Sequence, residues 1–390
     1  MARFDPKTKA LKTQLAHLGR NPDEHFGFVN PPVIRASTVL FENTAAMEGR
    51  ASSRYSYGLT NTPLIEALTD AITALEDAAG TVLVPSGLAA VTLPILAAAE
   101  PGDQILIPDN VYWPTRRFAD ETLTRLGMRI TYYDPLIGAD IRSLFEGKVG
   151  IVFLEAPGSN TFEMPDIPAL VDAAREAGAV TMLDNTWATP LIYKPVPNGI
   201  DYSIQAGTKY FGGHADVLIG SVAASARVWP RLKETHRNMG LQAGTEEIFL
   251  TLRGLRSMGL RLAEHEKNAL EIAQWLKARS DVARVLHPAL PDDPGHAIWK
   301  RDFGGRASGL FGFELAGSKE QAARLLDSLK IFGLGFSWGG FESLAALANL
   351  GPTRTATPWS AGPVIRLQIG LEEPKDLMDD LDQAFRAAFG

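Results

Sequence analysis

The sequence contains no cysteine and only seven histidines among its 390 residues. The absence of cysteine excludes disulfide bonds, thiolate metal sites and thiol nucleophiles. No two histidines have the His-Glu-x-x-His spacing of a zinc-binding helix. His214 lies between two glycines and Ala215, where we expect a hydrogen-bonded loop residue, so the sequence predicts no metal site.

Long apolar segments are also lacking. The longest one, from Leu88 to Ala99, contains Thr92 and Pro94 and is too short to cross a bilayer. Residues 1–20 are charged and have no apolar centre, unlike a secretory signal. The net charge of −7 is small, and scattered basic residues give no footprint for nucleic acid. We therefore expect a cytoplasmic protein that binds neither nucleic acid nor membrane.

The chain is longer than a typical single domain, and its pattern changes twice. Residues 1–60 are polar and interrupted by proline, which predicts an N-terminal arm. Residues 61–250 alternate short apolar runs with helical periods, as an α/β domain with a mostly parallel sheet does. Residues 251–390 predict a smaller α+β C-terminal domain. The expected strands are 81–84, 104–107, 129–133, 150–154, 180–183, 217–224, 310–315 and 364–369, and expected helices include 64–75, 168–177, 251–280 and 374–389.

Two residues of the expected α/β domain suggest chemistry. Lys209 stands among small and apolar residues, where partial desolvation would lower its pKa and make it a usable nucleophile and base. The alternative is an ordinary surface lysine. Asp184 ends an apolar run, where a carboxylate can face a ligand in an open α/β sheet. The alternative for Asp184 is a helix N-cap.

Two further residues suggest anion binding. Gly87 follows the apolar run that ends at Val84, in a turn of small residues between an expected strand and an expected helix. The first turn of a helix has free backbone N–H groups, which can bind a phosphate. The alternative is a plain strand–helix turn. Because side chains alternate along a strand, Arg366 lies on one face of the expected strand 364–369. Its guanidinium could bind an α-carboxylate or form a buried salt bridge.

Taken in order, with 25 residues from Asp184 to Lys209, these features resemble the cystathionine β-lyases of the Cys/Met-metabolism family of pyridoxal-phosphate enzymes. The resemblance runs from about Tyr57 to the C-terminus. It is carried by Leu183-Asp184-Asn185-Thr186-Trp187, Thr208-Lys209-Tyr210, Leu286-His287-Pro288-Ala289-Leu290-Pro291, Phe336-Ser337-Trp338-Gly339-Gly340-Phe341-Glu342-Ser343 and Val364-Ile365-Arg366-Leu367-Gln368-Ile369-Gly370-Leu371-Glu372.

The resemblance implies the α/β fold of pyridoxal-phosphate-dependent transferases, fold type I, which is aspartate-aminotransferase-like. It implies pyridoxal 5′-phosphate as cofactor and a homotetramer, a dimer of dimers, whose sites are shared between subunits. The implied catalytic residues are Lys209, as Schiff-base lysine and base, and Tyr112, which would also stack on the cofactor ring; a core aromatic is the alternative for Tyr112. Asp184 would pair with the pyridine nitrogen. Phosphate binding is implied for Gly87, Leu88 and Thr208, and for Tyr57 on a neighbouring subunit. Substrate binding is implied for Arg366, helped by Ser337, and for Trp338.

Two departures from the family pattern concern the phosphate. The family usually reads Tyr-x-Arg where this chain has Tyr57-Gly58-Leu59, and Ala206 replaces a frequent serine. Leu59 cannot carry the charge that would contact the phosphate from across the interface or face the distal end of the substrate. Arg54 is nearby, but only its proximity suggests it as a replacement.

The expected reaction is β-elimination of L-cystathionine to homocysteine, pyruvate and ammonia, a carbon–sulfur lyase step of transsulfuration in methionine biosynthesis. The γ-acting relatives usually carry an acidic residue before the serine and lack the tryptophan after it, whereas this chain has Phe336 and Trp338. Core packing is the alternative for both aromatics.

Three other functions stay open. One is a broader cysteine-S-conjugate β-lyase, which Leu59 favours. Another is a γ-acting relative, meaning a cystathionine γ-lyase, a γ-synthase or a sulfhydrylase. The last is a non-catalytic regulator, against which the joint presence of Lys209, Asp184, Tyr112 and Arg366 argues.

Overall fold

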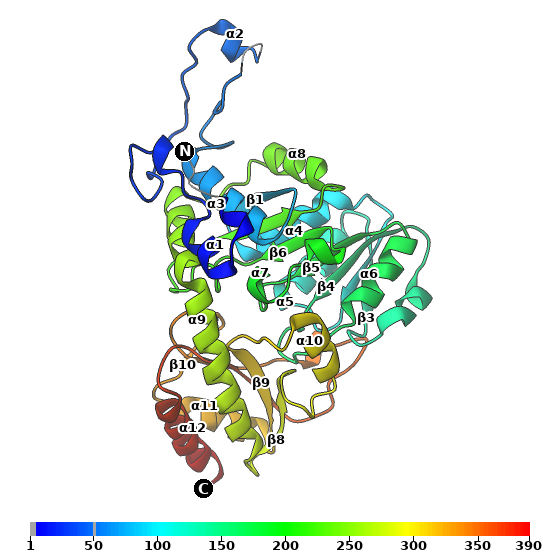
Figure 1. The fold of residues 1–390 in the computed structure, drawn as a ribbon. Coiled ribbons are helices and arrows are strands. Elements are labelled where there is room, and N and C mark those ends of the chain that lie inside the picture. Colours follow the sequence, from blue (N-terminus) through cyan, green and yellow to red (C-terminus); the bar gives the residue numbers. More distant parts are fainter. Residues whose placement is uncertain (1–4, 50–51) are drawn as a thin grey trace.

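The structure is a computed structural model that describes residues 5–49 and 52–390. A large sheet flanked by helices lies at the centre, a second sheet lies below it, and an N-terminal arm projects from the top (Figure 1). This is the α/β fold class expected from the sequence, with a mostly parallel large sheet followed by a smaller α+β part.

The large sheet has seven strands within the described residues, in the order β1-β7-β6-β5-β4-β2-β3. Strand β7 runs antiparallel to both of its neighbours, and the other pairs are parallel. The expected strand 217–224 begins only at Gly220, because Ile219 bonds to the turn at Thr208 instead. The strands are β1 (Gly80–Val84), β2 (Gln104–Pro108), β3 (Arg129–Tyr133), β4 (Val149–Glu155), β5 (Val180–Asp184), β6 (Tyr202–Gln205) and β7 (Gly220–Ala224).

Helices cover both faces of this sheet. Successive side chains of a strand point to opposite faces, and in β4 Ile151 and Phe153 join one core while Val152 and Leu154 join the other. Burial on both sides explains why the strands read as continuous apolar runs. The helices of this part are α3 (Pro63–Leu75), α4 (Gly87–Ala98), α5 (Trp113–Phe118), α6 (Ile167–Glu176), α7 (Thr189–Ile192) and α8 (Trp229–Met239).

The second sheet has five strands in the described chain, ordered β10-β11-β12-β9-β8. Helices α11 and α12 pack together beside it, and the buried Phe385 of α12 lies 6.0 Å from Phe313 of β9 between ring centroids. The elements are β8 (Val282–Leu286), β9 (Leu310–Leu315), β10 (Gly333–Leu334), β11 (Leu344–Leu347), β12 (Val364–Gln368), α10 (His296–Phe303), α11 (Lys319–Asp327) and α12 (Pro374–Phe389).

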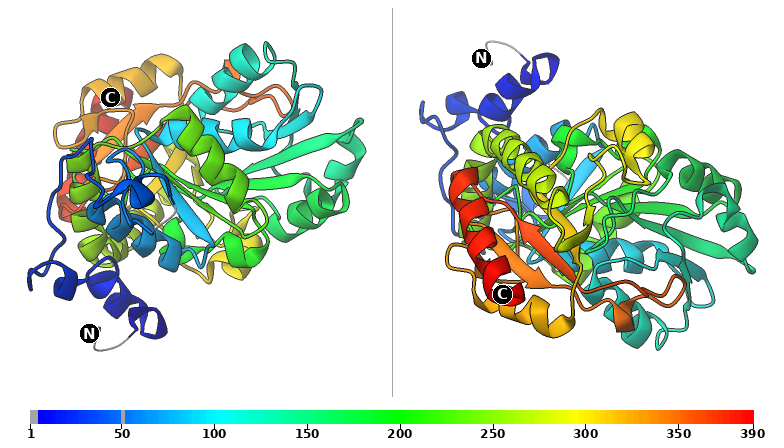
Figure 2. Two further views of the ribbon diagram at one scale, coloured as in Figure 1. Left: turned by 90° about the horizontal axis from the view of Figure 1, so that it is seen from above. Right: turned by 90° about the horizontal axis from the view of Figure 1, so that it is seen from below.

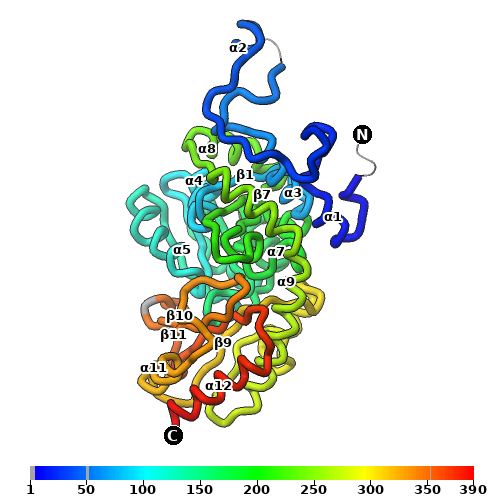
Figure 3. The backbone as a smooth tube through the Cα atoms, turned by 90° about the vertical axis from the view of Figure 1, so that its left-hand side faces the viewer, coloured from blue at the N-terminus to red at the C-terminus, as the bar shows by residue number. Residues whose placement is uncertain are grey.

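One long helix, α9 (Thr245–Lys277), joins the two sheets and runs down the molecule from one to the other (Figure 3). Its first half packs on α3 and α1 (Leu11–His17), and Gly254 lies so close to the carbonyls of Phe211 and Gly212 that a methyl group would clash. Its second half contacts the end of β12, where the His265 ring lies 2.7 Å from the Ile369 carbonyl oxygen.

The N-terminal arm extends away from the body, with α2 (Thr44–Met47) near its tip (Figure 1). Seen from above and below, its first helical segments, in dark blue, project from the side of the body (Figure 2). Within its described part, an isolated bridge pairs Thr38 with Tyr57. Residues 1–4 and 50–51 of the predicted arm lie outside the described residues. Several apolar side chains of the arm are exposed: Phe26, Phe28, Val29, Leu40 and Met47.

Short helical turns complete the described chain. The 3₁₀ turns are Pro6–Thr8, Pro22–Glu24, Gly138–Leu144, Val196–Asn198 and Gly351–Thr353, and Ala119–Leu123 forms a π-helical turn.

Candidate active site

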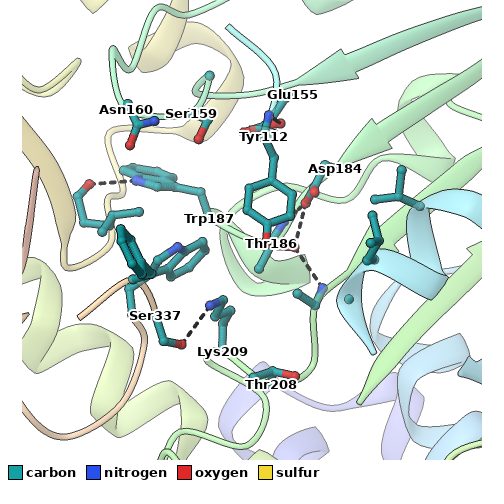
Figure 4. A pocket seen from close by; sticks show the side chains of 18 of the residues that line it. Tyr112, Glu155, Ser159, Asn160, Asp184, Thr186, Trp187, Thr208, Lys209 and Ser337 are labelled. Atoms are coloured by element: carbon teal, nitrogen blue, oxygen red, sulfur yellow. Dashed lines mark hydrogen bonds between the residues drawn. The ribbon is translucent and has the colours of Figure 1, made fainter. Parts of the chain in front are cut away.

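A cavity of about 380 Å³ lies at the carboxyl ends of the large-sheet strands, closed on one side by segments of the second sheet. Ligands of open α/β sheets bind at this edge, and the volume suits a small organic molecule. Tyr112, Asp184, Lys209 and Ser337 surround one space in it (Figure 4).

Lys209 follows β6 on a tight turn, in which its N–H donates to the Ala206 carbonyl at 2.9 Å. Its Nζ donates to Ser337 Oγ at 2.8 Å and lies 5.2 Å from the centre of the Trp338 ring. Burial, and then the charge of Arg366, lower the pKa of the Lys209 amine to about 8, while Asp184 acts the other way. Lys209 is therefore a cavity-facing amine that loses its proton near pH 8, and not a surface lysine.

Asp184 is the last residue of β5. Its Oδ1 accepts hydrogen bonds from the N–H and the hydroxyl of Thr186, at 3.0 and 2.6 Å. Among the described residues these are its hydrogen-bond donors, so Oδ2 is left for a ligand. Burial raises the pKa of Asp184 despite these bonds. The N-cap alternative is wrong, since α7 begins at Thr189 after Ala188.

Glu155 is a site residue that sequence reasoning missed. It ends β4 directly beside Asp184 in the sheet register, and its Oε2 accepts the N–H of Tyr112 at 2.9 Å. Burial, and then the neighbouring charge of Asp184, raise the pKa of Glu155 well above its usual range. Two carboxyl groups in one buried place indicate a site built for a cationic ring. Glu155 could have been predicted by the signal that identified Asp184, a carboxylate at the end of a buried strand.

A turn at the start of α4 offers an anion site. The N–H groups of Gly87 and Leu88 lie in the first helical turn, where a helix leaves them without internal acceptors, and both residues line the cavity. A methyl group on Gly87 would lie 2.6 Å from the Ala206 side chain, so the turn needs glycine. The Thr208 hydroxyl lines the same cavity but already exchanges hydrogen bonds with the Ile219 backbone.

Arg366 brings the second cation to the cavity from β12. Its Nη2 donates to the Phe336 carbonyl at 2.8 Å, and burial lowers its pKa to about 10. No carboxylate of the described chain pairs with it, so the salt-bridge alternative is wrong for these residues. A half-buried guanidinium without a counterion is suited to an anionic ligand.

The two aromatics beside Ser337 differ in their surroundings. Phe336 is 89% exposed at the rim of the cavity, so it does not pack in the core. Trp338 packs 5.5 Å from the Tyr210 ring and also lines the cavity, so it packs in the core, and its part in substrate binding stays a prediction. Ser337 contacts Lys209, and its predicted help to Arg366 stays a prediction.

The remaining predicted residues lie outside the cavity of their own chain. Tyr57 is half exposed on the arm, and Leu59 contributes to a separate hollow beside α8. The Arg54 guanidinium pairs with Glu24 and Glu66, so it is already neutralised within its own chain. The Nδ1 atom of His214 lies 2.8 Å from the Gly212 carbonyl oxygen, as a loop histidine should.

Pyridoxal 5′-phosphate fits these residues. The unpaired Oδ2 of Asp184 beside Glu155 suits a protonated pyridine nitrogen, and the turn at Gly87 suits a phosphate. An amine with a lowered pKa at Lys209 suits covalent attachment to an aldehyde.

Comparison with known proteins agrees with this geometry. Residues 12–386 match the family described as Cys/Met metabolism PLP-dependent enzyme. The chain is 54% identical to a putative cystathionine β-lyase of Rhizobium johnstonii, with 97% of this chain and 96% of that protein covered. It is 43% identical to cystathionine β-lyase MetC of Escherichia coli, covering 97% and 98%. A crystal structure of cystathionine γ-synthase from Xanthomonas oryzae pv. oryzae, 30% identical, superposes with a TM-score of 0.90 over 97% of this chain and 98% of that one.

Proposed function

The chain belongs to the Cys/Met metabolism family of pyridoxal-phosphate-dependent enzymes, and from this premise we propose that it cleaves L-cystathionine to homocysteine, pyruvate and ammonia. The observation that carries the proposal is one cavity holding both a lysine amine of lowered pKa and an arginine without a carboxylate partner in the described chain. Relatives named as cystathionine β-lyases, at 54% and 43% identity, support the choice of reaction.

Four residues would hold the cofactor. Asp184 would keep the pyridine nitrogen protonated, the N–H groups of Gly87 and Leu88 would bind the phosphate, and Tyr112 would lie over the ring. Pyridoxal 5′-phosphate, when bound, supplies a conjugated ring that takes up the electrons left behind at the substrate Cα.

The substrate would be oriented by its carboxylate. Arg366 would bind that carboxylate, which fixes the amino acid with its Cα toward Lys209. The Lys209 amine would then remove the Cα proton as a general base. The Cβ–S bond breaks as the thiolate leaves and takes up a proton to become homocysteine. Water then hydrolyses the remaining three-carbon amine, so that its carbons end as pyruvate and its amino group as ammonia.

The residue at the rim of the cavity, Phe336, favours β-cleavage over the γ-acting alternatives. Moving a proton one carbon further out needs an acid or base near Cγ, whereas position 336 offers an apolar ring that is largely exposed at the rim. The likeness to a γ-synthase structure shows kinship of fold, and the β-lyase relatives are more similar in sequence.

A broader cysteine-S-conjugate β-lyase is the second candidate, and Leu59 favours it. Arg54, the nearest cation in the sequence, is paired with Glu24 and Glu66, so it does not replace the missing arginine within its own chain. Rates on cystathionine and on an S-alkyl cysteine would discriminate, and a strong preference for cystathionine would exclude the broader activity.

Identification of the products tests the main proposal. Purified protein with added cofactor and L-cystathionine should release pyruvate and homocysteine. Oxobutyrate with cysteine would mean γ-cleavage instead. Lys209→Ala should abolish turnover, while Lys267→Ala, on an exposed face of α9, should not. A cellular phenotype that survived Lys209→Ala would support the regulator alternative.

We also propose a homotetramer with shared sites. The exposed phenylalanines at 26 and 28 on the projecting arm support contact with another chain, since isolated arms seldom expose such side chains without a partner. Tyr57 would then reach the phosphate of the neighbouring subunit. Sedimentation of the purified protein would test the stoichiometry.

A further inference from the structure

Asp109, directly after β2, binds a segment from the far end of the chain. It is fully buried, and its carboxylate accepts the backbone N–H groups of Thr355, Ala356 and Thr357 at 2.8, 3.0 and 2.8 Å. Burial alone would raise the pKa of Asp109, but these N–H groups and Arg116 lower it to about 2. A lasting negative charge therefore holds residues 353–357 against the large sheet.

Arg116 fastens the same segment from α5, the helix that begins directly after Tyr112. Its Nη1 donates to Asp109 Oδ1 at 3.0 Å and to the Thr353 carbonyl at 2.7 Å. Its Nη2 donates to the Thr355 hydroxyl at 2.6 Å. The helix that follows Tyr112 is thus anchored to the C-terminal part of the chain.

Arg354 connects a third segment, residues 157–163, which also lines the cavity. Its Nη1 donates to Thr161 Oγ1 at 3.0 Å and to Glu163 Oε1 at 2.9 Å. The other oxygen of Glu163 accepts the side-chain amide of Asn110 at 2.8 Å. The Nε atom of Arg354 lies 3.5 Å from Asp109 Oδ2. We call Asp109, Arg116, Arg354 and segment 353–357 the clasp.

We propose that the clasp positions Tyr112 over the cofactor ring, so that Asp109 and Arg354 are positioning residues for cofactor binding. The Tyr112 side chain is 45% exposed, so its own packing does not fix it. Its direction depends on a backbone held by Glu155 at its N–H and by the clasp at residues 109 and 116. This inference rests on the proposed function, which assigns the ring contact to Tyr112.

A double-mutant cycle on cofactor affinity tests the clasp without using turnover. Cofactor-free protein is titrated with pyridoxal 5′-phosphate for the wild type, Arg354→Gln, Tyr112→Ala and the double variant. If the clasp acts through Tyr112, Arg354→Gln weakens binding about 10-fold, equivalent to about 1.4 kcal/mol, when Tyr112 is present. In the Tyr112→Ala background the loss should be less than about 2-fold, because coupled residues are not additive.

Arg142→Gln is the matched control, since it breaks an arginine–glutamate pair with Glu176 that lies on the surface. An equal loss from Arg354→Gln in both backgrounds, or no loss, would overturn the proposal. If Arg354→Gln does not fold, Thr355→Val replaces it in the same cycle. It removes only the hydroxyl that accepts from Arg116 and donates to Asp109. It should weaken binding about 3-fold, less than Arg354→Gln, because the charges of the clasp stay in place.

Failure of the proposed function gives a different result. If the wild type binds the cofactor and the double-mutant cycle shows the expected coupling, but cystathionine is not turned over, the proposed reaction is wrong and the proposal for the clasp stands. A wild type that turns over cystathionine but shows additive losses overturns the clasp alone. A wild type that binds no cofactor contradicts both.

Discussion

Lys209 Nζ donates a hydrogen bond of 2.8 Å to Ser337 Oγ, a residue 128 positions later in the chain. The bond joins the turn after β6 to the segment that precedes β11. This hydrogen bond places Lys209, the proposed base, between the two sheets, in the same cavity as Arg366 of the second sheet. The ionisation of Lys209 therefore depends on residues from both parts.

The first prediction concerns the pH at which the cofactor attaches. Only the unprotonated Lys209 amine can attack an aldehyde, so attachment to cofactor-free protein should rise about tenfold per unit up to pH about 8 and then level. Because the Arg366 charge lowers this pKa and Asp184 raises it, Arg366→Met should move the profile to higher pH and Asp184→Asn to lower pH. Stopped-flow absorbance would measure this; a profile unmoved by either change would contradict it.

Arg366→Met should also lower kcat/KM for amino-acid substrates by on the order of 30-fold to 5000-fold. Truncating one partner of a buried charge pair costs about 2–5 kcal/mol. The defect should vanish for an amine analogue that lacks the carboxylate. Arg386→Met is the control, since that side chain is 78% exposed on α12. Equal losses with both substrates would show that Arg366 does not bind the carboxylate.

Gly87→Ala should weaken cofactor binding, because the new methyl group would lie 2.6 Å from the Ala206 side chain and displace the phosphate turn. Ala206→Gly removes that side chain and should restore binding in the double variant. Equilibrium dialysis with pyridoxal 5′-phosphate would show this. If the second change does not rescue the first, the contact between positions 87 and 206 is not what limits the turn.

Glu155→Gln should change how stability depends on pH. The folded-state pKa of Glu155 lies well above the unfolded value of about 4.5, so the folded state binds the extra proton and stability is lost as pH rises. Glutamine does not titrate, so the variant should gain free energy of unfolding over the wild type as pH increases from about 4.5. Urea denaturation of cofactor-free protein would measure this, with Glu146→Gln on the surface as control. A pH-independent difference would contradict the burial argument.

Local sequence patterns were enough to predict many of the strands and helices and several of the candidate site residues. Strands 129–133 and 310–315 and helix 374–389 have the expected bounds, because apolar periodicity reports burial directly. Lys209 was found because it stands among small and apolar residues, and Asp184 because it ends a buried strand. Their roles stay predictions, as do the domain boundaries and the cytoplasmic location. No helix in the described part of the chain is long and apolar enough to span a membrane.

What the sequence could not give depends on register or on distant segments. Glu155 becomes part of the site only because β4 and β5 pair with Glu155 opposite Asp184. Nothing near Asp109 in the sequence singles it out, since its partners lie 246 to 248 positions later. The proposed contact of Tyr57 with a neighbouring subunit needs a second chain, which one sequence does not contain.

Helix α9 also sets a rule for building chimaeras between relatives of this protein. Its 33 residues span about 50 Å and fix the spacing between the Lys209 turn and the end of β12. Gly254 must stay with the turn at Gly212, while Asn268 must stay with the Glu372 carbonyl, to which it donates at 3.3 Å. A crossover between positions 254 and 268 keeps both of these helix contacts native. The two parents must then also match at the clasp and at the contact between Lys209 and Ser337, because these join residues on either side of the crossover.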